Sequence, residues 1–355
     1  MYKTLHQLVA ILWYQPKVSW ARWLARLLMP LSCLYAGIVY LRRWAYRIGV
    51  FRQERLAVPV IVVGNITVGG TGKTPLVIKL SQLLCEHGYH PGIITRGYKG
   101  NATRSNQGCV IISSNTLHDL PPHRVGDEAI LLARKARCPV AVSPKRVAAA
   151  QQLIAKYGCD LIISDDGLQH YALGRDIEIA VIDSQRGMGN AHLLPAGPLR
   201  EPISRLKTVD FVVSKGLYAD VSYCADVSCE YTYPIKLPQQ QQSLTYFQQF
   251  PRNQIHVLAG IANPESFFEE LRDLGLQFQA HGFPDHYAYS AADIDFGPES
   301  IVLMTEKDAV KVEPYADHRH WAVSLKVELS ENFINNLLTK LKQVGTGVDH
   351  AKPTL

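Results

Sequence analysis

The sequence has no closely paired cysteines. It contains no C-x-x-C pair, and its seven cysteines are scattered singly through 355 residues. Zinc sites and small disulfide-bonded folds depend on closely spaced or paired cysteines, so neither class is supported. Several of the cysteines lie in apolar segments, where a free thiol packs as a small hydrophobic side chain. The cysteine pattern therefore indicates a protein of a reducing compartment.

Acidic residues are scarce near the N-terminus. Residues 1–55 contain nine Lys or Arg residues and a single acid, Glu54, whereas the other 300 residues hold 28 basic and 30 acidic groups. The net charge of +6 is therefore a property of the N-terminal segment. Nucleic-acid-binding proteins spread basic charge over a binding face. We accordingly expect no nucleic-acid partner, and we infer no obligate protein partner from the sequence.

The N-terminal segment also has a short apolar run. Residues 27–41 form an uncharged run of 15 residues, which as a helix covers about 22 Å of the roughly 30 Å hydrocarbon core. Tryptophans and arginines flank it, as at a membrane interface, and the arginines directly after it disfavour a cleaved signal peptide. We predict that residues 1–48 form a membrane-associated helix, spanning or interfacial, on the anionic cytoplasmic leaflet. A buried core helix is the alternative.

A glycine-rich block gives the strongest functional signal. Residues 69–74 read G-G-T-G-K-T between an apolar run of strand length, 60–63, and a predicted helix, 75–88, which we expect Pro75 to open. The backbone N–H groups of such a turn bind phosphate, with Lys73 on the β- and γ-phosphates and the Thr74 hydroxyl on Mg²⁺. The residues expected to bind ATP are Thr67, Val68, Gly69, Gly70, Thr71, Gly72, Lys73 and Thr74. Thr67 stands where the usual motif has its first glycine.

Downstream of this block, apolar strand-like segments alternate with helical ones. This alternation predicts an α/β fold with a mainly parallel, P-loop NTPase-like sheet over residues 49–225. The pattern weakens at residues 219–254, which we interpret as a domain junction. It resumes in a second, smaller α/β domain, 226–345, followed by a tail, 346–355.

Acidic side chains end two of the apolar strands. Asp165 and Asp166 follow the run 161–163, and Asp183 follows the run 179–182. An acid at the end of a strand can hold Mg²⁺ beside a bound triphosphate. We favour Asp165 and Asp166, because adjacent like charges are hard to explain without a cation.

Two further groups have both a structural and a catalytic interpretation. Asp127 and Glu128 precede an apolar helical run, so they suit the N-cap and first turn of a helix at least as well as catalysis. Asp285 and His286 form a polar pair in a predicted loop, where a histidine is usually structural but can also activate a hydroxyl.

Taken together, these blocks resemble the tetraacyldisaccharide 4′-kinase family of lipid A biosynthesis. The resemblance extends over most of the chain and includes the N-terminal helix and the phosphate loop, where Thr67 is normal for the family. Its further blocks are R-G-Y at 96–98, V-G-D-E-A at 125–129, D-D-G-L-Q-H at 165–170, P-A-G-P-L-R-E at 195–201, G-I-A-N-P at 260–264, F-P-D-H-Y at 283–287 and T-E-K-D-A at 305–309.

The resemblance implies a kinase at the cytoplasmic face of the bacterial inner membrane. It would transfer the γ-phosphoryl group of ATP to the 4′-hydroxyl of a tetraacylated glucosamine disaccharide 1-phosphate, forming lipid IVA. Asp127 would be the catalytic base with His286 as its partner, Lys73 and Asp166 would also be catalytic, and Asp165 and Asp166 would serve Mg²⁺. The candidates near the lipid substrate are Arg96, Tyr98, Glu128, Arg146, Gln169, His170 and Arg200.

Other P-loop classes fit the sequence less well. A membrane-attached ATPase switch of the partitioning type carries a signature lysine where this chain has Val68. A GTPase is poorly supported, because Lys215 follows an apolar strand but Leu217 replaces the aspartate that reads guanine. A non-catalytic nucleotide-binding scaffold at the membrane would bind ATP without turnover.

Overall fold

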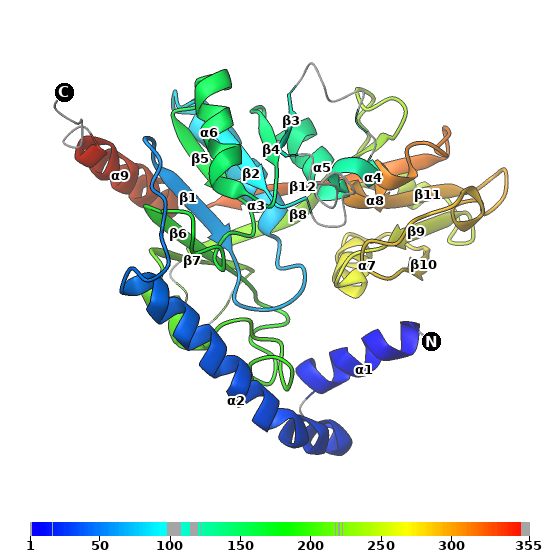
Figure 1. Cartoon of the computed structure of the whole chain (residues 1–355). Coiled ribbons are helices and arrows are strands. Elements are labelled where there is room, and N and C mark those ends of the chain that lie inside the picture. Colours follow the sequence, from blue (N-terminus) through cyan, green and yellow to red (C-terminus); the bar gives the residue numbers. More distant parts are fainter. Residues whose placement is uncertain are drawn as a thin grey trace.

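The computed structural model describes residues 2–15, 17–97, 108–113, 120, 122–216, 218, 221 and 223–348 (Figure 1). The chain begins with two helices, α1 (Tyr2–Tyr14) and α2 (Ser19–Arg47), outside the sheet. The elements from residue 60 to residue 215 are β1 (Val60–Gly64), α3 (Lys73–Glu86), β2 (Pro91–Thr95), β3 (Val110–Ile112), α4 (Pro122–Val125), α5 (Asp127–Lys135), β4 (Val140–Val142), α6 (Arg146–Tyr157), β5 (Leu161–Ser164), β6 (Ile177–Asp183) and β7 (Phe211–Lys215). The remaining elements are β8 (Tyr223–Pro234), β9 (Ile255–Ala259), α7 (Pro264–Asp273), β10 (Gln279–Gly282), β11 (Ile301–Thr305), α8 (Glu306–Val312), β12 (His320–Leu329) and α9 (Glu331–Val348).

The strands within the described ranges form one continuous sheet. Its order is β10-β9-β11-β12-β8-β7-β6-β1-β5-β2-β4-β3, and its pairings are parallel except for β8 with β12 and β3 with β4. We call the part built on β1 to β7 the first lobe and the part built on β9 to β11 the second lobe. The expected α/β class with a mainly parallel sheet is confirmed.

Alternate side chains of the strands bury opposite faces of the first lobe. Ile61 and Val63 of β1 pack with α3, α5 and α9, whereas Val60 and Val62 pack with α6 on the other face. Strands buried on both faces read as continuous apolar runs, which is why residues 60–63 were recognisable in the sequence. The two helical layers hold the strand ends, and with them the loops that carry polar side chains, in fixed positions.

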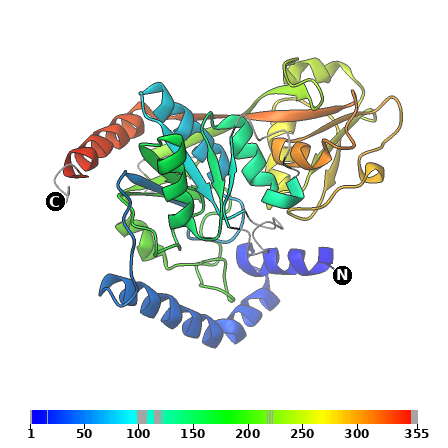
Figure 2. The same ribbon diagram turned by 45° about the horizontal axis from the view of Figure 1, so that its top comes forward.

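The predicted division at 225/226 falls inside a strand. β8 runs from Tyr223 to Pro234; its residues 223–225 pair with β7, and the stretch from Ala225 to Pro234 pairs with β12. The residues interpreted as a junction therefore contain a long strand of the central sheet. The chain also returns from the second lobe to the first. β12 pairs with β11 on one side and β8 on the other, and α9, which follows it, packs on the first lobe (Figure 2).

An aromatic contact holds α9 against the first lobe. Phe333 is fully buried, with its ring centroid 5.3 Å from that of Phe211 and 5.4 Å from that of Tyr223. We expect Phe333→Ala to lower the free energy of unfolding by about 3–5 kcal/mol, because it leaves a cavity in the core. Denaturant unfolding followed by circular dichroism checks this, with the exposed Asn335→Ala as the control, expected within about 0.5 kcal/mol of wild type. A loss below about 1 kcal/mol would mean that α9 adds little to the core.

The N-terminal helices turn apolar side chains outward. α2 has 29 residues and is long and apolar enough to cross a membrane, although most of it is exposed. Leu27, Leu34 and Leu41, at helical spacing, are 75%, 63% and 60% exposed. The opposite side of α2 contacts the protein through Ser32, whose hydroxyl donates to the Leu193 carbonyl and accepts from the Ala196 N–H. A soluble helix buries its apolar stripe, so α2 has the reverse arrangement.

Candidate functional site

The phosphate loop connects β1 to α3 as the sequence predicts. The helix begins at Lys73 rather than at Pro75, so Pro75 is its third residue and the expectation that it opens α3 was wrong. Proline is tolerated there because the first-turn N–H groups have no partner within the helix. Gly72 precedes the helix with φ +81°, a left-handed conformation that favours glycine. The free N–H groups of the first turn therefore point toward the loop, as a bound phosphate requires.

A cluster of opposite charges lies beside the loop. The Lys73 Nζ is 3.3 Å from the Asp166 Oδ1, and the Arg200 Nη1 donates to both carboxylate oxygens of Asp166 at 3.1 Å. The buried Arg146 donates to the Ser164 hydroxyl and to the Asp166 carbonyl, each at 3.0 Å. Burial raises the pKa of Asp166, but the charges of Lys73 and Arg200 outweigh it and hold the pKa at about 2. Asp166 is therefore ionised and sits between two cations.

Asp165 is in a different electrostatic environment from its neighbour. It is 3% exposed, and burial together with the negative charges of Glu128 and Asp166 raises its pKa to about 7. Thr95 donates to its Oδ2 at 3.3 Å, while its buried Oδ1 has no hydrogen-bond partner in the described structure. A buried carboxylate with a free oxygen, next to a phosphate loop, matches the chemistry of a Mg²⁺ ligand, which needs one or two carboxylates besides phosphate oxygens. Asp165, Asp166 and Thr74 therefore fit such an ion.

A second cluster brings together residues that are far apart in the sequence. The His286 Nδ1 is 3.2 Å from the Asp127 Oδ1 and 3.1 Å from its Oδ2, across a separation of 159 residues. Asp127 begins α5 and is 7% exposed, and His286 adopts a left-handed conformation with φ +59°. Burial raises the pKa of Asp127, but the His286 hydrogen bond and the charge of Lys307 outweigh it and hold the pKa at about 2. The N-cap residue of α5 is Gly126, so the interpretation of Asp127 as the N-cap was wrong: Asp127 lies in the first turn, and its carboxylate contacts His286.

Lys307 joins this second cluster from the first turn of α8. Its Nζ is 2.8 Å from the Glu128 Oε1, 3.2 Å from the Asp285 Oδ1 and 3.4 Å from the His286 Nε2. Burial lowers the pKa of Lys307, but these carboxylates outweigh it and raise the pKa above its usual range. The second lobe thus contributes a fixed positive charge and an imidazole to the face of α5.

The other predicted substrate residues lie near the first cluster, with one outside the described chain. Gln169 donates to the Asn65 carbonyl at 3.0 Å and to the Glu201 Oε1 at 2.8 Å. Burial and neighbouring arginines lower the pKa of His170 to about 4, so it is neutral at physiological pH. Arg96 is exposed at the end of β2. Tyr98 lies outside the described residues.

Comparisons with known proteins agree with this geometry. A family model for tetraacyldisaccharide-1-P 4′-kinase matches residues 24–342. The chain belongs to this family. The Nitrosococcus oceani tetraacyldisaccharide 4′-kinase is 48% identical over 93% of this chain and 93% of its own length. The Methylobacillus flagellatus kinase is 44% identical over 92% of this chain and 98% of its own.

A solved structure of the family shares the fold. The Aquifex aeolicus LpxK, crystallised in complex with ATP, is 28% identical and matches with a TM-score of 0.74 over 90% of this chain and 99% of that one. The family resemblance read from the sequence is therefore confirmed, and this chain has the kinase fold of tetraacyldisaccharide-1-P 4′-kinases.

The structure adds three residues to the site that the sequence analysis did not single out. Lys307 is one, although its block was part of the family resemblance. Glu201 is 1% exposed and accepts hydrogen bonds from Gln169 and Tyr171. Arg186 packs on the phosphate loop, where a Cβ at Gly69 would lie 3.2 Å from its Nη1, and its Nη2 donates to the Ala262 carbonyl of the second lobe at 2.5 Å. Arg186 lies in none of the motifs or family blocks, so nothing in the sequence distinguished it from other arginines.

Proposed function

We propose that the chain transfers the γ-phosphoryl group of ATP to the 4′-hydroxyl of a tetraacylated glucosamine disaccharide 1-phosphate, forming lipid IVA. The observation that supports this most directly is the Asp127–His286 pair, held beside Lys307 on the same side of the fold as a phosphate loop. Phosphoryl transfer needs positioning, charge neutralisation and a group that receives the hydroxyl proton. The two clusters supply those three elements.

Asp127 is the group that binds the acceptor hydroxyl and takes up its proton. A carboxylate with a pKa near 2 is a weak base, so its first task is to accept a hydrogen bond from the hydroxyl and orient it. Proton transfer then follows late, when the loose transition state has made the attacking oxygen acidic. His286 fixes the carboxylate through Nδ1, and Lys307 keeps it ionised.

Lys73 and Arg200 provide the positive charge for the transferring phosphoryl group. Both contact Asp166 in the described structure, so a bound triphosphate would exchange one anionic partner for another without moving the cations far. Thr74, Asp165 and Asp166 would hold Mg²⁺, which when bound neutralises the β- and γ-phosphate oxygens. Arg96, Arg146, Glu128, Gln169 and His170 are proposed to line the lipid headgroup.

A direct assay tests the reaction. Purified protein is incubated with ATP, Mg²⁺ and the disaccharide 1-phosphate lipid, and the mass of the lipid is measured. We expect a gain of one phosphate on the lipid. Hydrolysis of ATP without that gain would instead support a membrane-attached ATPase switch.

We also propose that α2 attaches the kinase to the cytoplasmic face of the inner membrane. Its exposed leucine stripe and the basic residues at both ends of its apolar run suit an anionic leaflet. Attachment there would bring the phosphate loop to an acceptor that is itself a membrane lipid.

The leucine stripe of α2 gives a test that keeps the fold intact. Deleting the helix would also remove the Ser32 contacts, so we choose Leu27→Ser/Leu34→Ser/Leu41→Ser. We expect the variant to shift from the membrane pellet to the supernatant, because it loses roughly 1.5–3 kcal/mol of transfer free energy per leucine. Leu237→Ser/Leu274→Ser, which changes exposed leucines elsewhere, is the control. A triple variant that stays in the pellet would show that other surfaces hold the protein.

A further inference from the structure

A loop formed by residues 190–201 joins the phosphate loop to the first charged cluster. The Val68 N–H donates to the Pro198 carbonyl at 2.8 Å, and the Arg200 N–H donates to the Ile66 carbonyl at 2.6 Å. The 190–201 loop thus pairs with the first residues of the phosphate loop and also carries the Arg200 guanidinium that contacts the cluster. Its position therefore determines where this guanidinium lies relative to a bound triphosphate.

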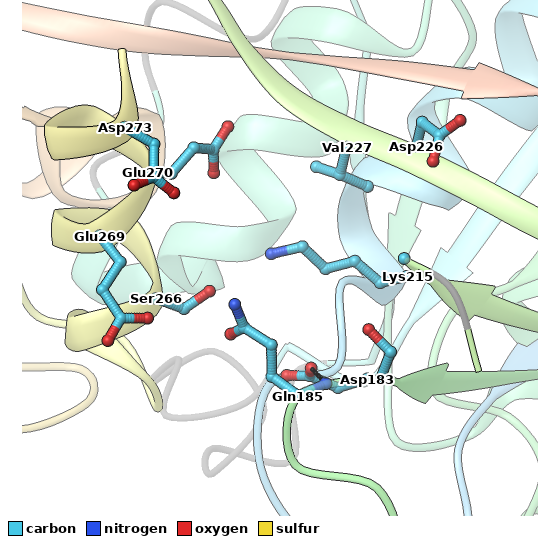
Figure 3. Close-up of a pocket in the computed structure, with 11 residues that line it drawn as sticks. Asp183, Gln185, Lys215, Asp226, Val227, Ser266, Glu269, Glu270 and Asp273 are labelled. Atoms are coloured by element: carbon cyan, nitrogen blue, oxygen red, sulfur yellow. Dashed lines mark hydrogen bonds between the residues drawn. The ribbon is translucent and has the colours of Figure 1, made fainter. Parts of the chain in front are cut away.

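The β7 side of the phosphate loop offers less support. There the loop borders a cavity of about 280 Å³ between the lobes, whose lining includes Asp183, Gln185 and Lys215 (Figure 3). A Cβ at Gly72 would lie 3.6 Å from the Cδ of Lys215. Since a cavity provides no contact partners for a backbone, the first residues of the phosphate loop depend on the 190–201 loop for their position.

Helix α2 holds the other side of the 190–201 loop through two hydroxyl groups. The Ser32 hydroxyl, on a residue that is 4% exposed, donates to the Leu193 carbonyl at 2.9 Å and accepts from the Ala196 N–H at 3.0 Å. The Tyr35 hydroxyl donates to the Arg200 carbonyl at 3.0 Å. Residues three apart are neighbours on a helix surface, so the two hydroxyls act from one face of α2.

Helix α1 adds contacts to both loops. The Trp13 Nε1 donates to the Pro195 carbonyl at 3.1 Å, and the Trp13 carbonyl accepts from the Asn190 N–H at 2.7 Å. The Tyr14 hydroxyl donates to the Val68 carbonyl at 3.4 Å. The N-terminal helices therefore contact the 190–201 loop near its beginning, middle and end, and they also contact the phosphate loop directly.

These contacts differ in kind from the membrane-facing surface of α2. The leucine stripe at Leu27, Leu34 and Leu41 lies on a different face, and apolar contacts of that type hold a helix without fixing its exact position. Hydrogen bonds depend on distance and angle, so bonds from Ser32 and Tyr35 to backbone groups define where the 190–201 loop lies.

We propose that Ser32 and Tyr35 are positioning residues for phosphoryl transfer, which act through the 190–201 loop to fix Arg200 against the phosphate loop. The inference rests on the proposed kinase function. The helix that attaches the kinase to the membrane then also sets the geometry of the transfer, from a separate face. A small displacement of a cation from the transferring phosphoryl group lowers kcat more than it lowers substrate binding.

Tyr35→Phe tests this proposal because it removes only the hydroxyl. We expect kcat for lipid phosphorylation to fall about three- to tenfold, the size of one hydrogen bond, with the KM for the lipid and the share of protein in the membrane pellet unchanged. Ser32→Ala leaves two backbone groups without their partner and should lower kcat about tenfold or more. Tyr40→Phe, which changes a tyrosine of the same helix that is 69% exposed, is the control and should match wild type.

A double variant shows whether Tyr35 acts through Arg200. Arg200→Ala keeps the backbone carbonyl that Tyr35 contacts but removes the guanidinium, and a radiolabelled-phosphate assay follows its slower turnover. We expect Tyr35→Phe to change kcat less than about twofold in the Arg200→Ala background, because the group that it positions is gone. Losses that multiply would place the effect of Tyr35 elsewhere and overturn the inference.

The remaining outcomes separate this inference from the kinase function. Wild-type kcat in Tyr35→Phe would overturn the positioning role and leave the kinase function in place. A higher KM for the lipid or a loss from the pellet, with kcat unchanged, would assign Tyr35 to lipid contact or attachment and also overturn the inference. Wild type that adds no phosphate to the lipid would overturn the kinase function, and the positioning role with it.

Discussion

Asp127→Asn is expected to lower kcat by about 10²–10⁴-fold while leaving the KM for ATP close to that of wild type. Asparagine keeps the size of the side chain in the first turn of α5, but it cannot take up the proton of the acceptor hydroxyl. The imidazole of His286 is 3.1 Å from the Asp127 carboxylate, so in the variant it would face a neutral amide instead of a negative charge. Since the residue contacts neither the phosphate loop nor Lys73, the loss should fall on turnover rather than on ATP binding.

Two comparisons make the Asp127 result interpretable. Asp160→Asn changes an exposed acid outside both clusters and should leave kcat within about twofold of wild type. His286→Ala should reduce kcat less than Asp127→Asn does, because it removes the group that holds the carboxylate but keeps the carboxylate itself. Wild-type turnover in Asp127→Asn would exclude Asp127 as the base and leave it a structural role in the first turn of α5.

Lys73→Met is expected to reduce kcat on the order of 10²–10³-fold. The substitution preserves the apolar stem but removes the ammonium group that faces Asp166 at 3.3 Å and would neutralise the β- and γ-phosphates. In the described structure Arg200 also contacts Asp166, so the carboxylate keeps one cation and the fold should survive. Thermal unfolding of the variant would be measured alongside turnover.

Lys79→Met is the matched control for the loop lysine. Lys79 lies on the same helix, α3, but it is not part of the loop. We expect full activity from this variant, since its charge lies away from the phosphate site. If both variants lost activity equally, the effect would come from the helix and not from the loop charge.

The fold could be predicted where strands are buried on both faces. Residues 60–63 are a continuous apolar run and 255–259 an apolar run interrupted only by His256, and each lies in a strand with every residue buried. β8 escaped prediction because it alternates buried and exposed residues, with Cys229 among the buried ones and Tyr231 only partly covered. Its polar positions look like a loop, and only the pairing with β12 makes it a strand. Long-range pairing of this kind leaves no local signal.

The candidate site was accessible to sequence reasoning for a different reason. The phosphate loop is a local structure, so its residues could be named from their spacing alone. The Asp127–His286 contact joins residues 159 positions apart, and without the family resemblance each residue had an equally good structural explanation. Lys307 had no local signal at all, because a lysine in the first turn of a helix is ordinary until the fold places Glu128 and Asp285 around it.

The continuous sheet has a mechanical consequence for the two lobes. Residues 226–234 of β8 pair with β12, and this antiparallel ribbon connects the sheet of one lobe to that of the other. A ribbon of this kind resists stretching and sliding because its hydrogen bonds run across the strands, but it twists easily. The register shifts between Ser324 and Leu325 of β12, where β8 has the extra residue Glu230, and a bulge of this kind increases the local twist. We therefore expect any movement of the second lobe relative to the phosphate loop to occur by twisting of this ribbon, which keeps its backbone hydrogen bonds.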